Sequence, residues 1–294
     1  MAELIEFTSF DEFLSYNEDF IKQQFYSHYY LIRMIEQVLN RQVDVYNSYN
    51  IVDGDNKRIM TLHVDGACLI YSNGWNDEML NLLSEQIDLK KATVNFDFSG
   101  NRHLIKQLFQ KQNEPFEIFK ERLIYQCEEL NEIPSDIGGQ AELCTFRDFK
   151  RLKHLAYEYH LEEYGSKAFR DLNSISDLVE KGIRAETFYL YRDSGIICCM
   201  AQLFGKETGY PWIGGFVTEK GQRNKGYASA FLYDLTEMVF NEGFEKCGLV
   251  SDATNPASNK VFKRVGYVPI YEYISMHALN PSAYSATGFE VRPL

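Results

Sequence analysis

The segment at residues 219–231, "EKGQRNKGYASAF", lies between the apolar run "WIGGFV" and the helical run "LYDLTEMVF". This order predicts a strand, a loop and a helix, and it places the small residues Gly226, Ala228 and Ser229 at the start of that helix. The first turn of a helix has unpaired backbone N–H groups and a partial positive charge, so it can hold a phosphate without any side chain. The segment therefore predicts an anion site within an α/β fold.

Two cations, Arg223 and Lys225, stand just before Gly226 and add positive charge where a pyrophosphate would lie. The alternative interpretation is a solvated turn with basic residues at a helix start. Two other phosphate motifs do not fit. The dinucleotide fingerprint needs three glycines and an acidic residue about 20 positions later, and a P-loop needs Gly-Lys-[Ser/Thr].

The 294 residues are enough for two domains at roughly 150 residues each. A helical pattern from Ser9 to about Leu39 opens the first domain, which we place at residues 1–130. A hairpin follows, formed by "RIMTLHV", the turn Asp65-Gly66 and "ACLIYS". The domain closes with helices and strands in the order 76–88, "ATVNFDF", 101–112 and "FEIFKERLIYQC".

Residues 131–144 are predicted to link the domains, because the stretch around them combines acids, a proline and two glycines with little apolar content. The second domain, residues 145–294, begins with Thr145 as a helix cap. Its predicted elements are a helix to about Tyr164, a helix over 174–182, three strands, a helix over 226–242, the strand "KCGLVSD", a helix over 256–265 and the strand "YVPIYEYISM". The predicted class is α/β (α+β), a mixed sheet flanked by helices and preceded by a smaller α/β domain.

Two motifs in the second domain resemble those of the GCN5-related N-acetyltransferases (GNAT). The family's acetyl-CoA loop has the pattern [Gln/Arg]-x-x-Gly-x-[Gly/Ala] between a strand and a helix, and Arg223, Gly226 and Ala228 fill it in order. The run "NPASNKVFKRVGY", residues 255–267, matches the family's Asn-x-x-Ser-Asn…Gly-[Phe/Tyr] segment. The resemblance implies acetyl-CoA as the co-substrate. The first domain lacks both motifs and looks like the degenerate N-terminal half of some two-domain members.

The resemblance also implies which residues bind the coenzyme. In such enzymes the strand before the loop splays from its neighbour, so that its backbone can pair with pantetheine, and the glycine pair Gly214-Gly215 is typical of such a place. The second motif holds the far side of the coenzyme, and its Asn255 is also a good helix cap before proline. The implied coenzyme-binding residues are Gly215, Phe216, Val217, Arg223, Asn224, Lys225, Gly226, Tyr227, Ala228, Ser229, Asn255, Ser258 and Asn259.

The resembled chemistry is direct attack of a neutral amine on the thioester carbonyl. Many family members carry a tyrosine that protonates the departing thiolate, and this chain has Phe262 there. The glutamate base often found early on the splayed strand is missing too, since that segment reads "YPWI". Asp252, at the end of the strand before Asn255, is the predicted catalytic base, and its alternative role is to cap a turn.

Composition limits the partners. A net charge of −12 disfavours nucleic acid and anionic membranes, because no basic excess is present to neutralise phosphates, and it suits a cationic amine. With no apolar run of 18 residues and no secretory signal, we expect a cytoplasmic protein. The six cysteines lack CxxC pairs and histidines at metal spacing, so we expect buried thiols and assign no metal.

The predicted function is transfer of an acetyl group from acetyl-CoA to a primary amine of a small molecule or peptide. The alternative is a noncatalytic acyl-CoA-binding or regulatory module, favoured by Phe262 and the missing strand carboxylate. Aromatic residues such as Tyr157, Tyr159, Tyr271 and Tyr273 are expected around the acceptor side or in the core. The first domain could complete the acceptor pocket or a homodimer interface.

Overall fold

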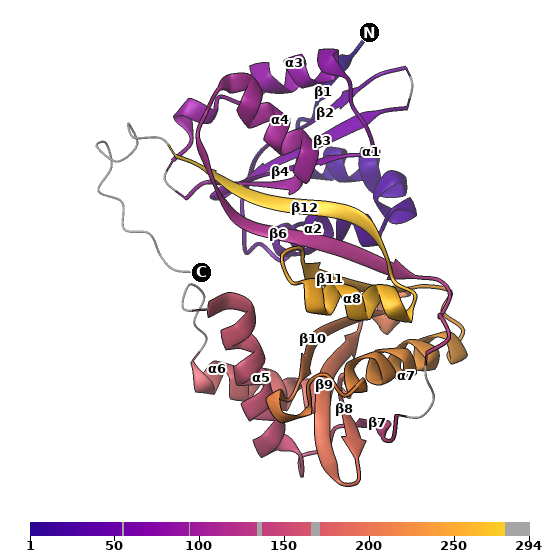
Figure 1. Ribbon diagram of the computed structural model, residues 1–294. Helices are drawn as coiled ribbons and strands as arrows, with labels where there is room; N and C mark the ends of the chain where they lie inside the picture. Colours follow the sequence, from indigo (N-terminus) through magenta and orange to yellow (C-terminus); the bar gives the residue numbers. More distant parts are fainter. Residues whose placement is uncertain (55, 94, 134–136, 166–170, 280–294) are drawn as a thin grey trace. The chain divides into compact units, whose positions relative to one another are not determined.

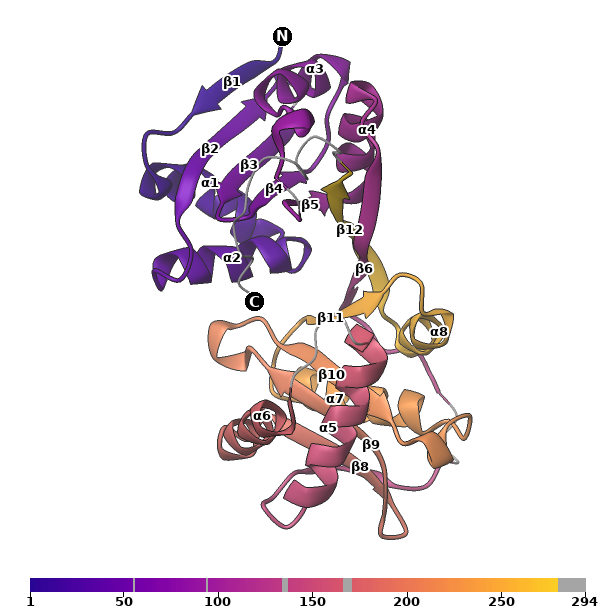
Figure 2. The same ribbon diagram turned by 90° about the vertical axis from the view of Figure 1, so that its left-hand side faces the viewer.

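The computed structural model describes the chain except for residues 55, 94, 134–136, 166–170 and 280–294. Its two compact units can be followed by colour in Figures 1 and 2. The first unit is Met1–Leu123 together with the segment from Tyr271 on, and the second is Ile124–Ile270. Part of the predicted linker and the last 15 residues of the predicted second domain, 280–294, lie outside the described residues.

Both halves of the sequence have the same order of helices and longer strands. The first half contains β1 (Glu3–Glu6), α1 (Phe10–Gln23), α2 (Tyr29–Leu39), β2 (Val45–Val52), β3 (Arg58–Val64), β4 (Ala67–Ser72), α3 (Asp77–Gln86), β5 (Asp97–Asn101), α4 (Arg102–Gln112) and β6 (Phe116–Cys127). The second half contains β7 (Gln140–Leu143), α5 (Phe149–Tyr164), α6 (Leu172–Arg184), β8 (Phe188–Asp193), β9 (Ile196–Phe204), β10 (Trp212–Thr218), α7 (Tyr227–Asn241), β11 (Cys247–Asp252), α8 (Pro256–Val265) and β12 (Val268–Ala278). The predicted α/β class is confirmed.

The second unit is a mixed sheet with helices on both faces. Its strands follow the order β11-β10-β9-β8-β7, with β6 on the other side of β11, and only the β10–β11 pair of this series is parallel. Successive residues of a strand point to opposite faces. Accordingly, Val217 of β10 joins the core beneath α5 and α6, whereas its neighbour Phe216 contacts Phe231 of α7. Strand β10 thus connects the two helical layers around the site.

In the first unit the strands follow the order β1-β2-β3-β4-β5-β12. Strand β12 pairs antiparallel with β5 from Tyr273↔Asn101 to His277↔Asp97. Its Ile274 and Met276 are completely buried in the core that α3 and α4 cover. The sequence places this strand in the second domain, but most of its residues complete the first unit. Tyr271 and Tyr273 also pack in the first unit, against the cluster beneath α1 and α2.

Other differences have local causes. The single helix expected from Ser9 to Leu39 is divided into α1 and α2 by a 3₁₀ turn at Tyr26–His28. Strand β2 was not predicted, because its interior carries buried polar residues, among them Asn50, whose amide donates to the Asn17 side chain at 2.7 Å. The helix expected to follow a Thr145 cap begins at Phe149, and Asp148 occupies the cap position. The Asp148 carboxylate accepts a hydrogen bond from the Thr145 hydroxyl at 3.1 Å.

The packing of β12 gives a stability prediction. We expect Ile274→Ala to lower the free energy of unfolding by about 2–5 kcal/mol, because it leaves a cavity in the core of the first unit. Hydrogen exchange of the β4 and β5 amides should accelerate with it. The control is Val268→Ala on the same strand, which is 56% exposed and should change stability little. Normal protection of β5 in the Ile274 variant would contradict the assignment of β12 to this core.

Candidate functional site

The site begins where β10 leaves β11. The two strands pair only at Trp212↔Gly248 and Ile213↔Leu249 within the described residues, although β11 continues to Asp252. On the other edge, the pairing of β10 with β9 shifts between Gly214 and Val217, and Gly215 has a φ of +58°. The bulge and the divergence leave backbone groups of this stretch without a strand partner on the β11 side. This divergence is the kind of splayed strand that the resemblance to the GNAT enzymes implies.

Helix α7 starts beside this opening. Gly226 occupies the position before the helix with a φ of +89°, and no side chain of the described residues caps it. The first N–H groups of α7 therefore stay open to a ligand. The positive φ favours glycine at this position, and a Cβ atom there would also push against the end of the Ile137 side chain. The helix mouth is formed by small residues, as predicted.

A hydrogen bond fixes the start of α7. The Tyr227 hydroxyl, on the first residue of the helix, donates to Oδ2 of Asp193, the last residue of β8, at 2.6 Å. This bond to the carboxylate raises the pKa of Tyr227 to about 12 and lowers the pKa of Asp193. The bond holds at neutral pH, because the donor stays protonated and the acceptor stays ionised.

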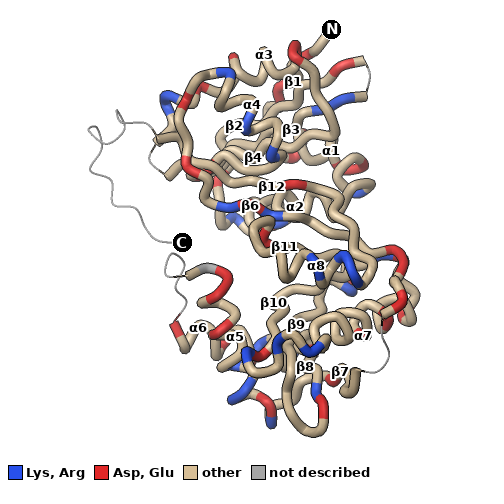
Figure 3. The backbone as a smooth tube through the Cα atoms, viewed as in Figure 1, with Lys and Arg blue, Asp and Glu red and all other residues tan. Residues whose placement is uncertain are grey.

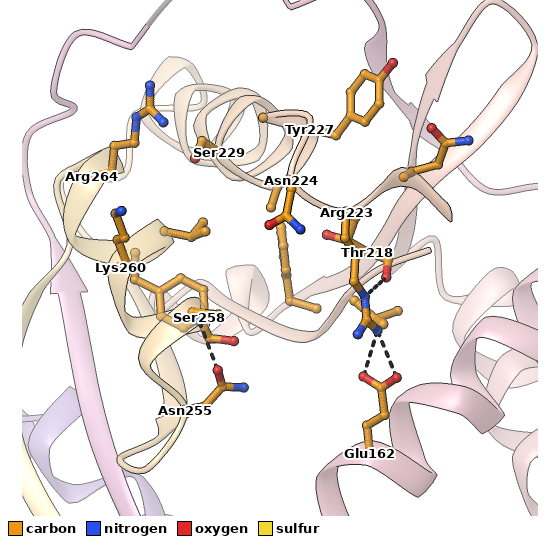
Figure 4. A pocket seen from close by; sticks show the side chains of 18 of the residues that line it. Glu162, Thr218, Arg223, Asn224, Tyr227, Ser229, Asn255, Ser258, Lys260 and Arg264 are labelled. Atoms are coloured by element: carbon orange, nitrogen blue, oxygen red, sulfur yellow. Dashed lines mark hydrogen bonds and ion pairs between the residues drawn. The ribbon is translucent and has the colours of Figure 1, made fainter. Parts of the chain in front are cut away.

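A pocket of about 620 Å³ opens over these elements (Figure 4), within the size range of small-molecule sites. Its walls come from α5, β10, the loop 219–226, α7 and α8, all in the second unit. Ten of the predicted coenzyme residues line it: Phe216, Val217, Arg223, Asn224, Gly226, Tyr227, Ala228, Ser229, Asn255 and Ser258.

Three predicted coenzyme residues do not line the pocket: Gly215, Lys225 and Asn259. Lys225 Nζ donates to Gln222 Oε1 at 2.8 Å. Asn259 is buried, and its Nδ2 donates to the Asp252 carbonyl at 3.0 Å while its Oδ1 accepts from the Tyr125 hydroxyl at 3.2 Å. The Asn259 amide thus holds the β11–α8 turn in place.

Asp252, the predicted base, lies in that same turn and does not line the pocket. Its Oδ1 accepts hydrogen bonds from the backbone N–H and the hydroxyl of Thr254, both at 2.7 Å. This is the turn-capping role that the sequence left open as the alternative. The catalytic role of Asp252 stays a prediction.

Arg223 meets a carboxylate across the pocket mouth. Its Nη2 donates to both oxygens of Glu162 on α5, each at 2.8 Å, and its Nε donates to the Thr218 carbonyl at 3.1 Å (Figure 4). Lys220 of the same loop lies 3.5 Å from Glu158 and 3.9 Å from Glu162. The acidic face of α5 is thus paired with the loop cations. Each exposed pair contributes about 0.2–1 kcal/mol to stability. Together the pairs hold the loop against α5 only weakly, so a ligand can displace them.

Lys260 and Arg264 of α8 are pocket residues that the sequence analysis missed. Figure 3 shows the basic positions of α8. The available signal was their spacing of four residues, which places both on one side of the helix.

Phe262 is buried and lines the pocket. Its ring meets Tyr125 and Phe216 nearly edge-on, at centroid distances of 5.8 and 6.4 Å. These are favourable aromatic geometries, so the residue has a clear packing role. Its ring has no proton to donate, and the hydroxyl of the adjacent Tyr125 is already bonded to Asn259.

Comparison with known proteins agrees with this geometry. Residues 149–267 match the model of the acetyltransferase (GNAT) family. These residues form a GNAT acetyltransferase domain. The domain contains every residue of the pocket, from Tyr159 to Arg264. No curated protein sequence matches the chain.

Solved structures extend the likeness in fold to most of the chain. A GNAT-family acetyltransferase from Colwellia psychrerythraea is 12% identical, with a TM-score of 0.53 over 94% of this chain and 99% of that one. A Drosophila protein is also 12% identical, with a TM-score of 0.51 over the same shares. A GCN5-related N-acetyltransferase from Sphaerobacter thermophilus is 14% identical, with a TM-score of 0.50 over 80% of this chain and 81% of that one. At such low identity the likeness shows the fold.

Other features of the described residues narrow the chemistry. None of the helices in that part of the chain is both long and apolar enough to cross a bilayer. No three His, Cys, Asp or Glu side chains among the described residues are grouped so that they could hold a metal ion. All six cysteines are buried free thiols, as predicted, and burial raises the pKa of the Cys199 thiol to about 12.

The Glu162 pair gives a binding prediction. We expect Glu162→Gln to tighten the binding of coenzyme A by about two- to fivefold, because it removes a negative charge from the mouth and releases Arg223. Calorimetry at low salt measures the effect. The control is Glu180→Gln, which breaks a similar pair with Arg184 on α6 and should leave affinity unchanged. Weaker binding in the Glu162 variant would instead show that the pair holds Arg223 in its binding orientation.

Proposed function

We propose that this chain transfers an acetyl group from acetyl-CoA to a primary amine by direct attack on the thioester. The observation that carries the proposal is the uncapped start of α7 beside a strand that has left its neighbour, both opening on one pocket. The match of residues 149–267 to the GNAT family supports it.

The pocket residues fit the parts of coenzyme A. The N–H groups at the start of α7 suit a diphosphate, and small residues leave them accessible. The unpaired edge of β10 around Gly215 and Phe216 offers hydrogen bonds to the amides of pantetheine, as an added strand would. Asn255 and Ser258 line the wall formed by α8. The chain would thus hold this co-substrate mainly with backbone groups.

The proposed reaction exchanges one bond to the acetyl carbon for another. The amine nitrogen bonds to the carbonyl carbon as the carbon–sulfur bond breaks, the amine loses a proton, and the sulfur leaves as a thiolate or takes up a proton. A backbone N–H on the β10 edge, beyond its last pair with β11, would polarise the carbonyl. Phe262 cannot supply the second proton, so water or helix-end N–H groups would stabilise the thiolate.

The base in this scheme is Asp252, as the sequence proposes. Its carboxylate receives two hydrogen bonds from Thr254 and does not line the pocket, so it can accept the proton only through intervening water. Such relays are compatible with general base catalysis. The acceptor would be a cationic amine of a small molecule or peptide, which the net charge of −12 favours.

A second candidate function is a noncatalytic acyl-CoA-binding module. It is favoured by the packing role of Phe262 and by the engagement of Asp252 in its turn. Both candidates share the coenzyme site and differ only in turnover.

The helix mouth is tested by Ala228→Asp. A carboxylate in the first turn favours the helix itself, so the fold should persist, but the charge would repel a diphosphate there. We expect coenzyme A affinity to fall by more than about tenfold in calorimetry. Ala228→Asn introduces a side chain of nearly the same size as aspartate but without its charge. Its affinity for coenzyme A should fall much less. Equal affinities for the two variants would place the diphosphate elsewhere.

Catalysis is tested by release of free thiol from acetyl-CoA in the presence of a panel of primary amines. We expect amine-dependent release that Ala228→Asp abolishes and Ala228→Asn largely retains. Coenzyme binding without amine-dependent release on any amine would favour the module. Absence of coenzyme binding by the wild-type protein would refute both candidates.

A further inference from the structure

We propose that Lys260 and Arg264 form a site for the 3′-phosphate of coenzyme A and so make the chain selective for the phosphorylated nucleotide. The inference rests on the proposed function. It assigns a role to two residues that lie within the run 255–267 but at positions that the family's pattern does not specify. It concerns recognition of the nucleotide end of the co-substrate, far from the reacting thioester.

The two cations share one wall of the pocket. Both line it from α8, and because they are four residues apart they lie one turn apart on the same side of the helix. Figure 4 shows them on one side, while Arg223 and Glu162 lie on the other and Asn224 lies between. The Lys260 and Arg264 wall is thus separate from the loop cation that is bound to Glu162.

The three cations of the pocket differ in whether a carboxylate is bound to them. Arg223 is held by both oxygens of Glu162 at 2.8 Å, so its charge is already balanced. Among the described residues, no carboxylate forms an ion pair with the side chain of Lys260 or Arg264, and both are exposed. Like charges one turn apart repel each other and destabilise a helix slightly. A dianion between Lys260 and Arg264 would remove this repulsion.

A phosphate monoester has the right charge for this place. It carries about −1.5 to −2 at neutral pH and offers three acceptor oxygens, enough for an ammonium and a guanidinium together. The diphosphate has another partner in the open N–H groups of α7, so the two cations on α8 are left for a second phosphate. Coenzyme A carries such a second phosphate on its ribose 3′-oxygen, and 3′-dephospho-coenzyme A lacks it.

Calorimetry with coenzyme A and 3′-dephospho-coenzyme A tests the assignment on the full chain. We expect the wild-type protein to prefer coenzyme A by about tenfold or more, since hydrogen bonds between charged groups are stronger than neutral ones. The double variant Lys260→Gln/Arg264→Gln should bind both ligands with the wild-type affinity for the dephospho form. Lys263→Gln is the matched control, because Lys263 is an exposed cation of the same helix that does not line the pocket.

The outcomes separate this assignment from the proposed function. A double variant that keeps the preference, or a wild-type protein that binds both ligands equally, overturns the 3′-phosphate site and leaves acetyl transfer standing. If the double variant loses affinity equally for both ligands, the two cations bind the diphosphate, and the 3′-phosphate site is overturned. A wild-type protein that binds neither ligand refutes the coenzyme site itself. Thermal unfolding of each variant confirms that the fold is intact, and Arg264→Lys should restore part of the preference.

Discussion

The site depends on backbone groups that the fold leaves unpaired. Strand β10 stops pairing with β11 after Ile213, and α7 begins without a capping side chain a few residues later. Buried or half-buried N–H and carbonyl groups are costly to leave unsatisfied, so such a place persists only where a ligand or water can pair with them. The bulge in β10, the positive φ of Gly226 and the Tyr227–Asp193 bond all maintain this arrangement. The pocket follows from it.

The charges of the pocket run against those of the whole chain. The protein has a net charge of −12, yet the pocket is lined by three cations and by only two carboxylates, Glu162 and Glu163. Among the described residues, only Arg223 of these three cations forms an ion pair, with Glu162. The wall formed by α8 therefore keeps its positive charge, whereas the charge at the loop is neutralised. An acidic surface can attract a cationic acceptor over a distance, whereas short-range cations and helix-end N–H groups retain an anionic co-substrate. Global and local electrostatics therefore serve the two substrates of the proposed reaction separately.

The sequence predicted those parts of the fold and of the site that are determined by residues close to one another along the chain. The Asp65-Gly66 hairpin and α8, with Asn255 as cap and proline after it, follow from turn and capping chemistry. The roles of Asn259 and Arg223 could not be predicted, because their partners Tyr125 and Glu162 come from distant segments. Strand β2 was hidden for the same reason, since its polar residues are satisfied by a helix that precedes it. Sequence periodicity carries no information on such partners.

The placement of β12 has a consequence for how the gene can be divided. The strand completes the sheet of the first unit, while the end of β6 belongs to the second. A fragment that stops at the predicted linker would leave the edge of β5 bare, and a bare apolar edge recruits strands from other molecules. Expression of either half by itself would thus favour aggregation, whereas co-expressed halves could exchange these strands and reconstitute the protein by complementation.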